Sequence, residues 1–182
     1  MKKVVGLIGR IASGKTIVSD QLLAGENTSY YRFSDVLKDV IERVHEENTR
    51  ENLQELGLAL RGVFGDGVLA AALKKDIEAD DADLIVVDGI RYDDEYDMVK
   101  SLGGVIVYVT APEQTRYERV LGRATRGEAE LSLEDFRHNE SKETEKRIDE
   151  LGENADYIIE NTGTLDELNE KVSEVVEKII SQ

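Results

Sequence analysis

Gly9-Arg10-Ile11-Ala12-Ser13-Gly14-Lys15-Thr16 follows the apolar run Val4-Val5-Gly6-Leu7-Ile8 and matches the pattern G-x-x-x-x-G-K-[ST] at every fixed position. In this pattern the glycines let backbone amides turn toward bound phosphates, and the following helix points its positive N-terminal end at them. The lysine reaches the β- and γ-phosphates, and the last hydroxyl is a ligand of Mg²⁺. The stretch predicts a triphosphate-binding loop in which the contacts come from Gly9, Ala12, Ser13, Gly14, Lys15 and Thr16.

Outward from this loop, apolar strands alternate with helices along the whole chain. The pattern predicts strands at 4–8, 30–33, 84–87, 105–109 and 157–159. It predicts helices at about 14–24, 36–44, 49–64, 68–79, 132–151 and 165–180, with another beginning after Pro112. Such alternation favours an α/β fold with a parallel sheet covered on both faces, and ligands bind beyond the carboxyl ends of its strands.

Composition narrows the class of protein. The 182 residues suit one domain, 1–182, with a single core. The absence of cysteine excludes disulfide scaffolds, thiolate metal sites and cysteine nucleophiles, and two histidines argue against histidine-rich chemistry. A net charge of −16 argues against duplex binding, because nucleic acid is itself a polyanion. With neither a membrane span nor a secretory signal, we expect a cytoplasmic monomer or homodimer without nucleic-acid or membrane partners.

Basic residues nevertheless gather in two short segments. Residues 1–25 and 116–126 each carry four lysines or arginines against one acid, a net charge of +3. Two basic segments in an acidic chain indicate a small anionic ligand, although chance clustering on solvated helices would give the same counts.

Asp88 and Arg91 follow the predicted strand at 84–87. An acid at this strand end is expected to hold Mg²⁺ through water, and the alternative is a helix N-cap. Arg91 stands in an otherwise acidic run, where its planar guanidinium could bind a second phosphate or form an ion pair with a neighbouring acid.

Two predicted helices place arginines along one side. Arg50, Gln54, Gly57 and Arg61 share one face of the helix at 49–64, opposite a stripe expected to face the core and formed by Leu53, Leu56, Leu60 and Phe64. Arg116, Arg119, Arg123 and Arg126 share a face before a polar, glycine-containing segment. Arginines there could close over a transferring phosphoryl group, or either face could simply be solvated.

Together with these motifs, Asp88-Gly89-Ile90-Arg91 and Asn161-Thr162-Gly163 make the chain similar to the small P-loop kinases, the group of nucleoside monophosphate kinases and dephospho-CoA kinases. Small archaeal-type proteins related to adenylate kinase and dephospho-CoA kinase are the nearest in pattern. The resemblance implies a five-stranded parallel sheet of order 2-3-1-4-5, an acceptor-binding helical region at about 34–80 and a short lid at about 123–132. It also implies that Asn161 and Gly163 lie against the adenine ring.

Two departures leave the acceptor open. The His-Pro pair of bacterial dephospho-CoA kinases is missing. Lys38 stands where adenylate kinases have an arginine, and a lysine cannot grip phosphate with two parallel bonds.

The leading hypothesis is an ATP- and Mg²⁺-dependent kinase acting on a nucleotide-like acceptor. Lys15 holds the donor, Thr16 and Asp88 serve the metal, and the predicted acceptor-binding residues are Asp35, Arg50, Arg61, Asp88 and Arg91. Arg119, Arg123 and Arg126 stabilise the transferring group, and Asp35 orients a hydroxyl if the acceptor is an alcohol. The alternatives are a non-catalytic nucleotide-binding protein and a GTPase-type switch, and the chain has no Asn-Lys-x-Asp guanine motif to favour the switch.

Overall fold

A computed structural model describes residues 2–123, 132–141 and 145–181, without the side chains of Arg50 and Arg123. Its five parallel strands form one sheet in the order β2-β3-β1-β4-β5, which confirms the predicted topology. The strands are β1 Lys3–Ile8, β2 Thr28–Arg32, β3 Leu84–Asp88, β4 Val105–Thr110 and β5 Tyr157–Glu160.

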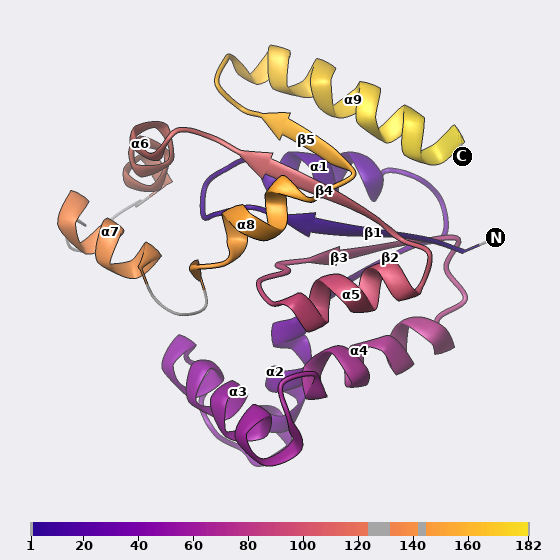
Figure 1. Cartoon of the computed structure of the whole chain (residues 1–182), viewed down its shortest axis with the longest axis vertical. Coiled ribbons are helices and arrows are strands. Elements are labelled where there is room, and N and C mark those ends of the chain that lie inside the picture. Colours follow the sequence, from indigo (N-terminus) through magenta and orange to yellow (C-terminus); the bar gives the residue numbers. More distant parts are fainter. Residues whose placement is uncertain (1, 124–131, 142–144, 182) are drawn as a thin grey trace.

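Helices connect the strands and cover the sheet (Figure 1). They are α1 Lys15–Leu22, α2 Phe33–Arg43, α3 Arg50–Phe64, α4 Val68–Ala79, α5 Asp93–Ser101, α6 Glu113–Arg123, α7 Leu133–Glu140, α8 Ile148–Glu153 and α9 Leu165–Ser181. Most match the sequence pattern, including the Thr49 N-cap, whose Oγ1 accepts a hydrogen bond from the Asn52 amide at 3.1 Å. The acidic run that contains α5 gave no prediction of a helix.

The central strand β1 is buried on both faces of the sheet. Val4 and Ile8 belong to a hydrophobic cluster with residues of α4, α5 and α8, whereas Val5 and Leu7 belong to a second cluster with α1 and α9. Gly6 faces the first cluster, where a Cβ would lie 2.6 Å from Ile90 Cδ1. The molecule therefore has three layers, and α3, α6 and α7 lie at the edge toward which the strands point (Figure 1).

The predicted helix at 132–151 is wrong as one element. α7 ends at Glu140 and α8 begins at Ile148. The two parts bury different surfaces: Phe136 of α7 packs on Tyr117 of α6, with ring centroids 5.5 Å apart, while Ile148 and Leu151 of α8 join the core under β1 and β4. A straight helix would not reach both surfaces.

The predicted core stripe of α3 is wrong at Phe64, whose side chain is 69% exposed. The helix instead approaches α2 through its glycine, where a Cβ on Gly57 would lie 3.4 Å from Leu37 Cδ1. Packing through a glycine turns Phe64 away from the sheet.

The first strand and the last helix are joined at the opposite edge of the molecule. Lys3 Nζ donates a hydrogen bond to the Ile179 carbonyl oxygen at 3.2 Å, where a cation suits the negative end of α9. No single helix in the described ranges has the length and apolar character to cross a membrane, although the bent pair Glu51–Phe64 and Val68–Ala79, with 96° between its helices, passes that test when taken together.

We expect Ile85→Ala, in the middle of β3, to lower the free energy of unfolding by about 2–5 kcal/mol, because Ile85 is fully buried and its loss leaves a cavity. The matched variant Ile158→Ala removes a side chain that is 51% exposed on the edge strand β5, and we expect a change within about 0.5 kcal/mol. Urea denaturation measures both, and equal losses would contradict the assigned core.

Candidate functional site

The phosphate loop joins β1 to α1 and curls around its own lysine. Gly14, the N-cap of α1, has φ 111°, and Ala12 has φ 58°, so the chain passes twice through the left-handed region. Lys15 Nζ donates hydrogen bonds to the carbonyl oxygens of Gly9 at 2.5 Å and Arg10 at 3.3 Å. Burial lowers the pKa of Lys15. The half-buried ammonium is thus held within the loop by two backbone carbonyl oxygens.

Asn161 and Arg119 brace this loop from outside. Asn161 Nδ2 donates to the Ser13 carbonyl at 2.7 Å, and the Arg119 guanidinium donates to the Ala12 carbonyl at 3.2 Å and to Asn161 Oδ1 at 3.0 Å. A Cβ on Gly14 would lie 2.5 Å from Asn161 Nδ2, so the contact requires glycine there. The loop, α6 and the segment after β5 are therefore tied together.

Gly163 lies beside the first turn of α9 and does not contact the phosphate loop through the neighbours that a Cβ at this position would meet. A Cβ there would overlap the Glu167 carboxylate, which accepts a hydrogen bond from the Thr164 amide at 2.7 Å.

Asp88 ends β3 beside the loop. Tyr30 donates its hydroxyl hydrogen to Asp88 Oδ2 at 2.7 Å, and burial together with this bond raises the pKa of Tyr30 to about 12. Asp88 Oδ1 is buried and has no hydrogen-bond partner in the part of the chain that the structure describes. An oxygen left free in this way fits a hard cation such as Mg²⁺ or one of its waters.

No group of three or more acidic or histidine side chains that could hold a metal occurs within the described ranges. This fits Mg²⁺ in phosphate sites, where a single carboxylate, a hydroxyl, waters and the substrate phosphates complete the coordination. Asp88 and Thr16 line the same cavity and could supply the carboxylate and the hydroxyl.

A cavity of about 890 Å³ runs from the phosphate loop to α3. Its walls include most of the residues that the sequence marked: Gly9, Ala12, Ser13, Gly14, Lys15, Thr16, Gln54, Gly57, Arg61, Asp88 and Arg91. Apolar side chains complete the acceptor end, namely Phe33, Leu37, Leu53, Leu58, Leu69 and Ile90. One continuous space thus contains both the loop and two of the predicted acceptor arginines.

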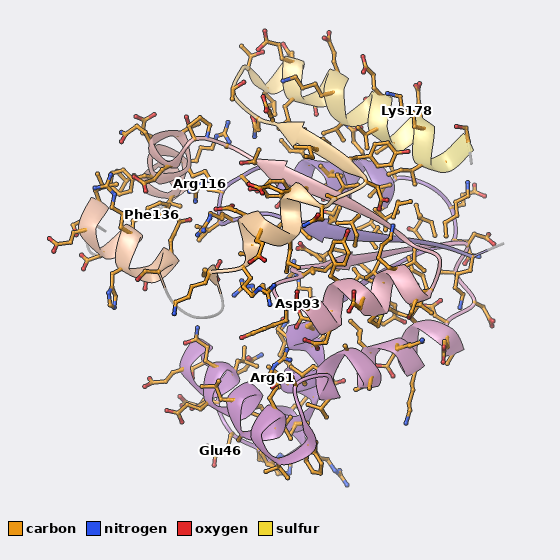
Figure 2. The ribbon with its side chains drawn as sticks, in the orientation of Figure 1. Glu46, Arg61, Asp93, Arg116, Phe136 and Lys178 are labelled. Atoms are coloured by element: carbon orange, nitrogen blue, oxygen red, sulfur yellow. The ribbon has the colours of Figure 1, made fainter. Side chains whose placement is uncertain are left out.

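Arg61 reaches from α3 to α5 and is fully engaged there (Figure 2). Its guanidinium lies 2.8 Å from Glu95 Oε1 and 3.4 Å from Asp94 Oδ2, and stacks 4.1 Å from the centre of the Tyr92 ring. It also donates to the Asp66 carbonyl oxygen. These contacts fix the direction of the arginine at the cavity wall.

Glu95 links Arg61 and Arg91, the two predicted acceptor arginines in the cavity wall. Only 2% of the residue is exposed, and its Oε2 accepts a hydrogen bond from the Arg91 backbone amide at 2.8 Å. Burial raises the pKa of Glu95 to about 7, despite the opposing effects of that hydrogen bond and of Arg61.

The Arg91 side chain pairs with Glu145, with 2.6 Å between NH1 and Oε1. Glu145 precedes α8 and also lines the cavity. The ion pair that the sequence offered as an alternative is therefore present, but its partner lies far along the chain rather than in the neighbouring acidic run.

Other predicted residues lie elsewhere. Asp35 is absent from the cavity wall. Its carboxylate accepts a hydrogen bond from the Arg32 amide at 3.0 Å, a contact that caps α2, and another from Lys38 Nζ at 2.6 Å. Arg126 and nearly all of the predicted lid at 123–132 lie outside the described residues, as do the side chains of Arg50 and Arg123.

Arg116 fits neither the predicted phosphoryl-binding role of the arginine stripe nor the solvated alternative. It is buried, pairs with Glu140 of α7, donates to the Ala111 carbonyl at 3.0 Å and lies 5.6 Å from the centre of the Phe136 ring (Figure 2). It fastens α7 to α6.

Three cavity residues were missed in the sequence. Arg32 lines the wall beside Asp88, and Glu95 and Glu145 hold the acceptor arginines. Arg32 is the penultimate residue of the predicted strand at 30–33, close to the ligand-binding edge of the sheet, which was a usable signal. The two glutamates stand among many acids, and nothing in the pattern distinguishes them.

Comparisons with known proteins agree with this architecture. Residues 5–146 match the family model described as AAA domain. A UPF0200 protein from Hyperthermus butylicus is 29% identical over 180 residues, covering 98% of this chain and 96% of that protein. An uncharacterised protein from Eubacterium ventriosum, 15% identical, superposes over the full length of both chains with a TM-score of 0.63.

Shikimate kinase from Acinetobacter baumannii, solved with shikimate, covers all of this chain and 94% of its own at 15% identity, with a TM-score of 0.61. Identities this low show the fold alone. Together with the match to the family model, these superpositions confirm the predicted resemblance to the P-loop kinase fold.

We expect Glu95→Gln to change how stability depends on pH. A carboxyl with a pKa near 7 in the folded protein and an ordinary value when unfolded binds more protons in the native state, so stability falls as the pH rises between these values. Between about pH 5 and about pH 8 the wild type should lose about 2–3 kcal/mol relative to Glu95→Gln. Urea midpoints measure this difference, with the exposed variant Glu51→Gln as control. Parallel curves for wild type and Glu95→Gln would refute it.

Proposed function

Since the chain belongs to the AAA domain family, we propose that it is an ATP- and Mg²⁺-dependent phosphotransferase that moves the γ-phosphoryl group to a nucleotide-like acceptor, a nucleoside monophosphate or dephospho-CoA. The observation that carries the proposal is one cavity whose wall contains the phosphate loop, Arg91 after β3 and Arg61 of α3. Phosphoryl transfer requires mainly positioning and charge neutralisation, and the chain supplies both without a histidine base.

The donor binds at the loop. Loop amides and Lys15 hold the β- and γ-phosphates. By the resemblance to dephospho-CoA kinases, the segment that contains Asn161 and Gly163 would border the adenine. Arg119 already contacts the loop at the Ala12 carbonyl, from where it can stabilise charge on the transferring group together with Arg123 and Arg126.

Thr16 and Asp88 are the residues that would hold Mg²⁺. When bound, the metal would offset the negative charge of the triphosphate. Tyr30 and Arg32 orient the Asp88 carboxylate, so that its second oxygen stays directed away from them.

The acceptor binds between α3 and the segment after β3. Arg61 and Arg91 border this space, Arg50 begins the same helix as Arg61, and Asp35 stands at the start of α2. The apolar wall accommodates an uncharged part of the acceptor.

Lys15→Ala tests donor binding and transfer. Loss of the ammonium should lower kcat/KM by about 100-fold or more, since it removes charge stabilisation of the transferring phosphoryl group. Coupled measurement of ADP release with nucleoside monophosphates and dephospho-CoA gives the rates, and Lys75→Ala, at an exposed position on α4, is the matched control. Nucleotide binding without acceptor-dependent ADP release from the wild type would instead establish a non-catalytic binding protein.

Asp88→Asn tests the metal site. The amide preserves an acceptor for the Tyr30 hydroxyl but removes the carboxylate charge, so half-maximal activity should require roughly 10-fold more Mg²⁺. A fluorescent ATP analogue, titrated with and without Mg²⁺, reports the same shift in binding. An unchanged Mg²⁺ requirement would remove Asp88 from the metal site.

A further inference from the structure

Glu145 is a buried carboxylate at the transfer end of the cavity that the proposed function does not use. The residue is 7% exposed and lies between α7 and α8. Its Oε1 is 2.6 Å from Arg91 NH1, and both side chains line the cavity that contains Lys15. Burial lowers the pKa of Lys15, and the charges of Asp88 and Glu145 oppose that effect, which places both carboxylates within electrostatic range of the ammonium.

From this arrangement, and resting on the proposed phosphotransferase function, we infer that the reacting group of the acceptor is a hydroxyl rather than a phosphate, and that Glu145 accepts its proton. The inference decides between the two acceptor types left open above. It selects an alcohol, such as a sugar hydroxyl, over the phosphate of a nucleoside monophosphate.

Charge balance supports a neutral reacting group. Arg91 is already matched by Glu145, and Arg61 by Glu95 and Asp94. A phosphate at this point would bring two more negative charges beside the Glu145 carboxylate, and like charges at close range repel each other. A hydroxyl adds no charge and donates a hydrogen bond to a carboxylate.

An anionic group elsewhere on the acceptor still has a partner. Arg32 lines the cavity with its side chain 50% exposed, and its Nε donates to the Tyr30 hydroxyl at 2.9 Å. A nucleotide-like acceptor can therefore place a phosphate near Arg32 and its hydroxyl near Glu145.

The chemical step balances without another reagent. The hydroxyl oxygen forms a bond to the γ-phosphorus, the bond from that phosphorus to the β,γ-bridging oxygen breaks, and ADP leaves. The hydroxyl proton passes to the Glu145 carboxylate and then to solvent. Arg91 keeps that carboxylate in place through its ion pair.

Asp35 is less well placed for this proton. Its two oxygens are bonded to the Arg32 amide and to Lys38 Nζ, and the residue is absent from the cavity wall. Glu145 therefore takes the role that the sequence suggested for Asp35 with an alcohol acceptor.

The linkage formed in the product tests the acceptor class. The full-length protein is incubated with ATP, Mg²⁺ and a panel of nucleosides, dephospho-CoA and nucleoside 5′-monophosphates, and products are examined by ³¹P NMR. We expect a phosphate monoester, whose resonance shows no phosphorus–phosphorus coupling. Coupled resonances from a new phosphoanhydride would overturn the inference while supporting the proposed function. No acceptor-dependent ADP release from any compound would overturn both.

Variants test the residue. Glu145→Gln should lower kcat by about 100-fold or more, as expected for loss of a general base. Binding of a fluorescent ATP analogue should stay within about twofold, which shows that the variant is folded. Glu145→Asp should restore part of the activity, and Glu150→Gln, on the exposed surface of α8, should match the wild type.

A different result is expected if Glu145 merely occupies the place of an acceptor phosphate. Glu145→Gln would then raise turnover with nucleoside monophosphates, because Arg91 is released. That gain, or an unchanged kcat, would overturn the assignment of Glu145 as proton acceptor.

Discussion

Each residue of β1 beyond Lys3 has to fit between two hydrophobic layers, and this constraint positions the site. Val4 and Ile8 pack toward α5 and α8, Val5 and Leu7 pack toward α1 and α9, and Gly6 leaves room for Ile90. A strand held on both faces cannot shift its register without moving its apolar side chains to the wrong layer. The phosphate loop begins directly after this strand, so the position of its first residue is fixed by the strand. Hydrogen bonds from Asn161 and Arg119 to the Ser13 and Ala12 carbonyl oxygens hold the rest of the loop.

Carboxylates hold the two arginines in the cavity wall, Arg61 and Arg91. Burying an arginine in an ion pair costs desolvation, and the pair contributes orientation more reliably than stability. The desolvation cost is evident at Glu95, because burial raises the pKa of its carboxyl to about 7. The same carboxyl accepts hydrogen bonds from Arg61 and from the Arg91 backbone amide. The two arginines are therefore held in place and nearly balanced in charge before any ligand arrives.

Local patterns in the sequence were sufficient for the strands, most helices and the phosphate loop, because apolar runs and glycine spacing report directly on burial and backbone conformation. They failed where tertiary contacts decide. The break between α7 and α8 arises because Phe136 and Ile148 are buried against two different surfaces. The helix α5 was not predicted because its sequence is an acidic run, in which the burial of Glu95 gives no local signal. Glu145 meets Arg91 across 54 residues (145 − 91), a separation at which a single sequence gives no pairing signal.

The hydrogen bond from Lys3 to the end of α9 places the two chain ends together, on the edge of the sheet away from the cavity (Figure 1). The amino ends of parallel strands lie at that edge, so nothing attached there obstructs ligand entry at the carboxyl ends. A fused fluorophore or an immobilising tether at either end would leave the cavity facing solution. The same proximity suits the chain to circular permutation, with a short peptide linking the old ends and new ones opened in an exposed connection.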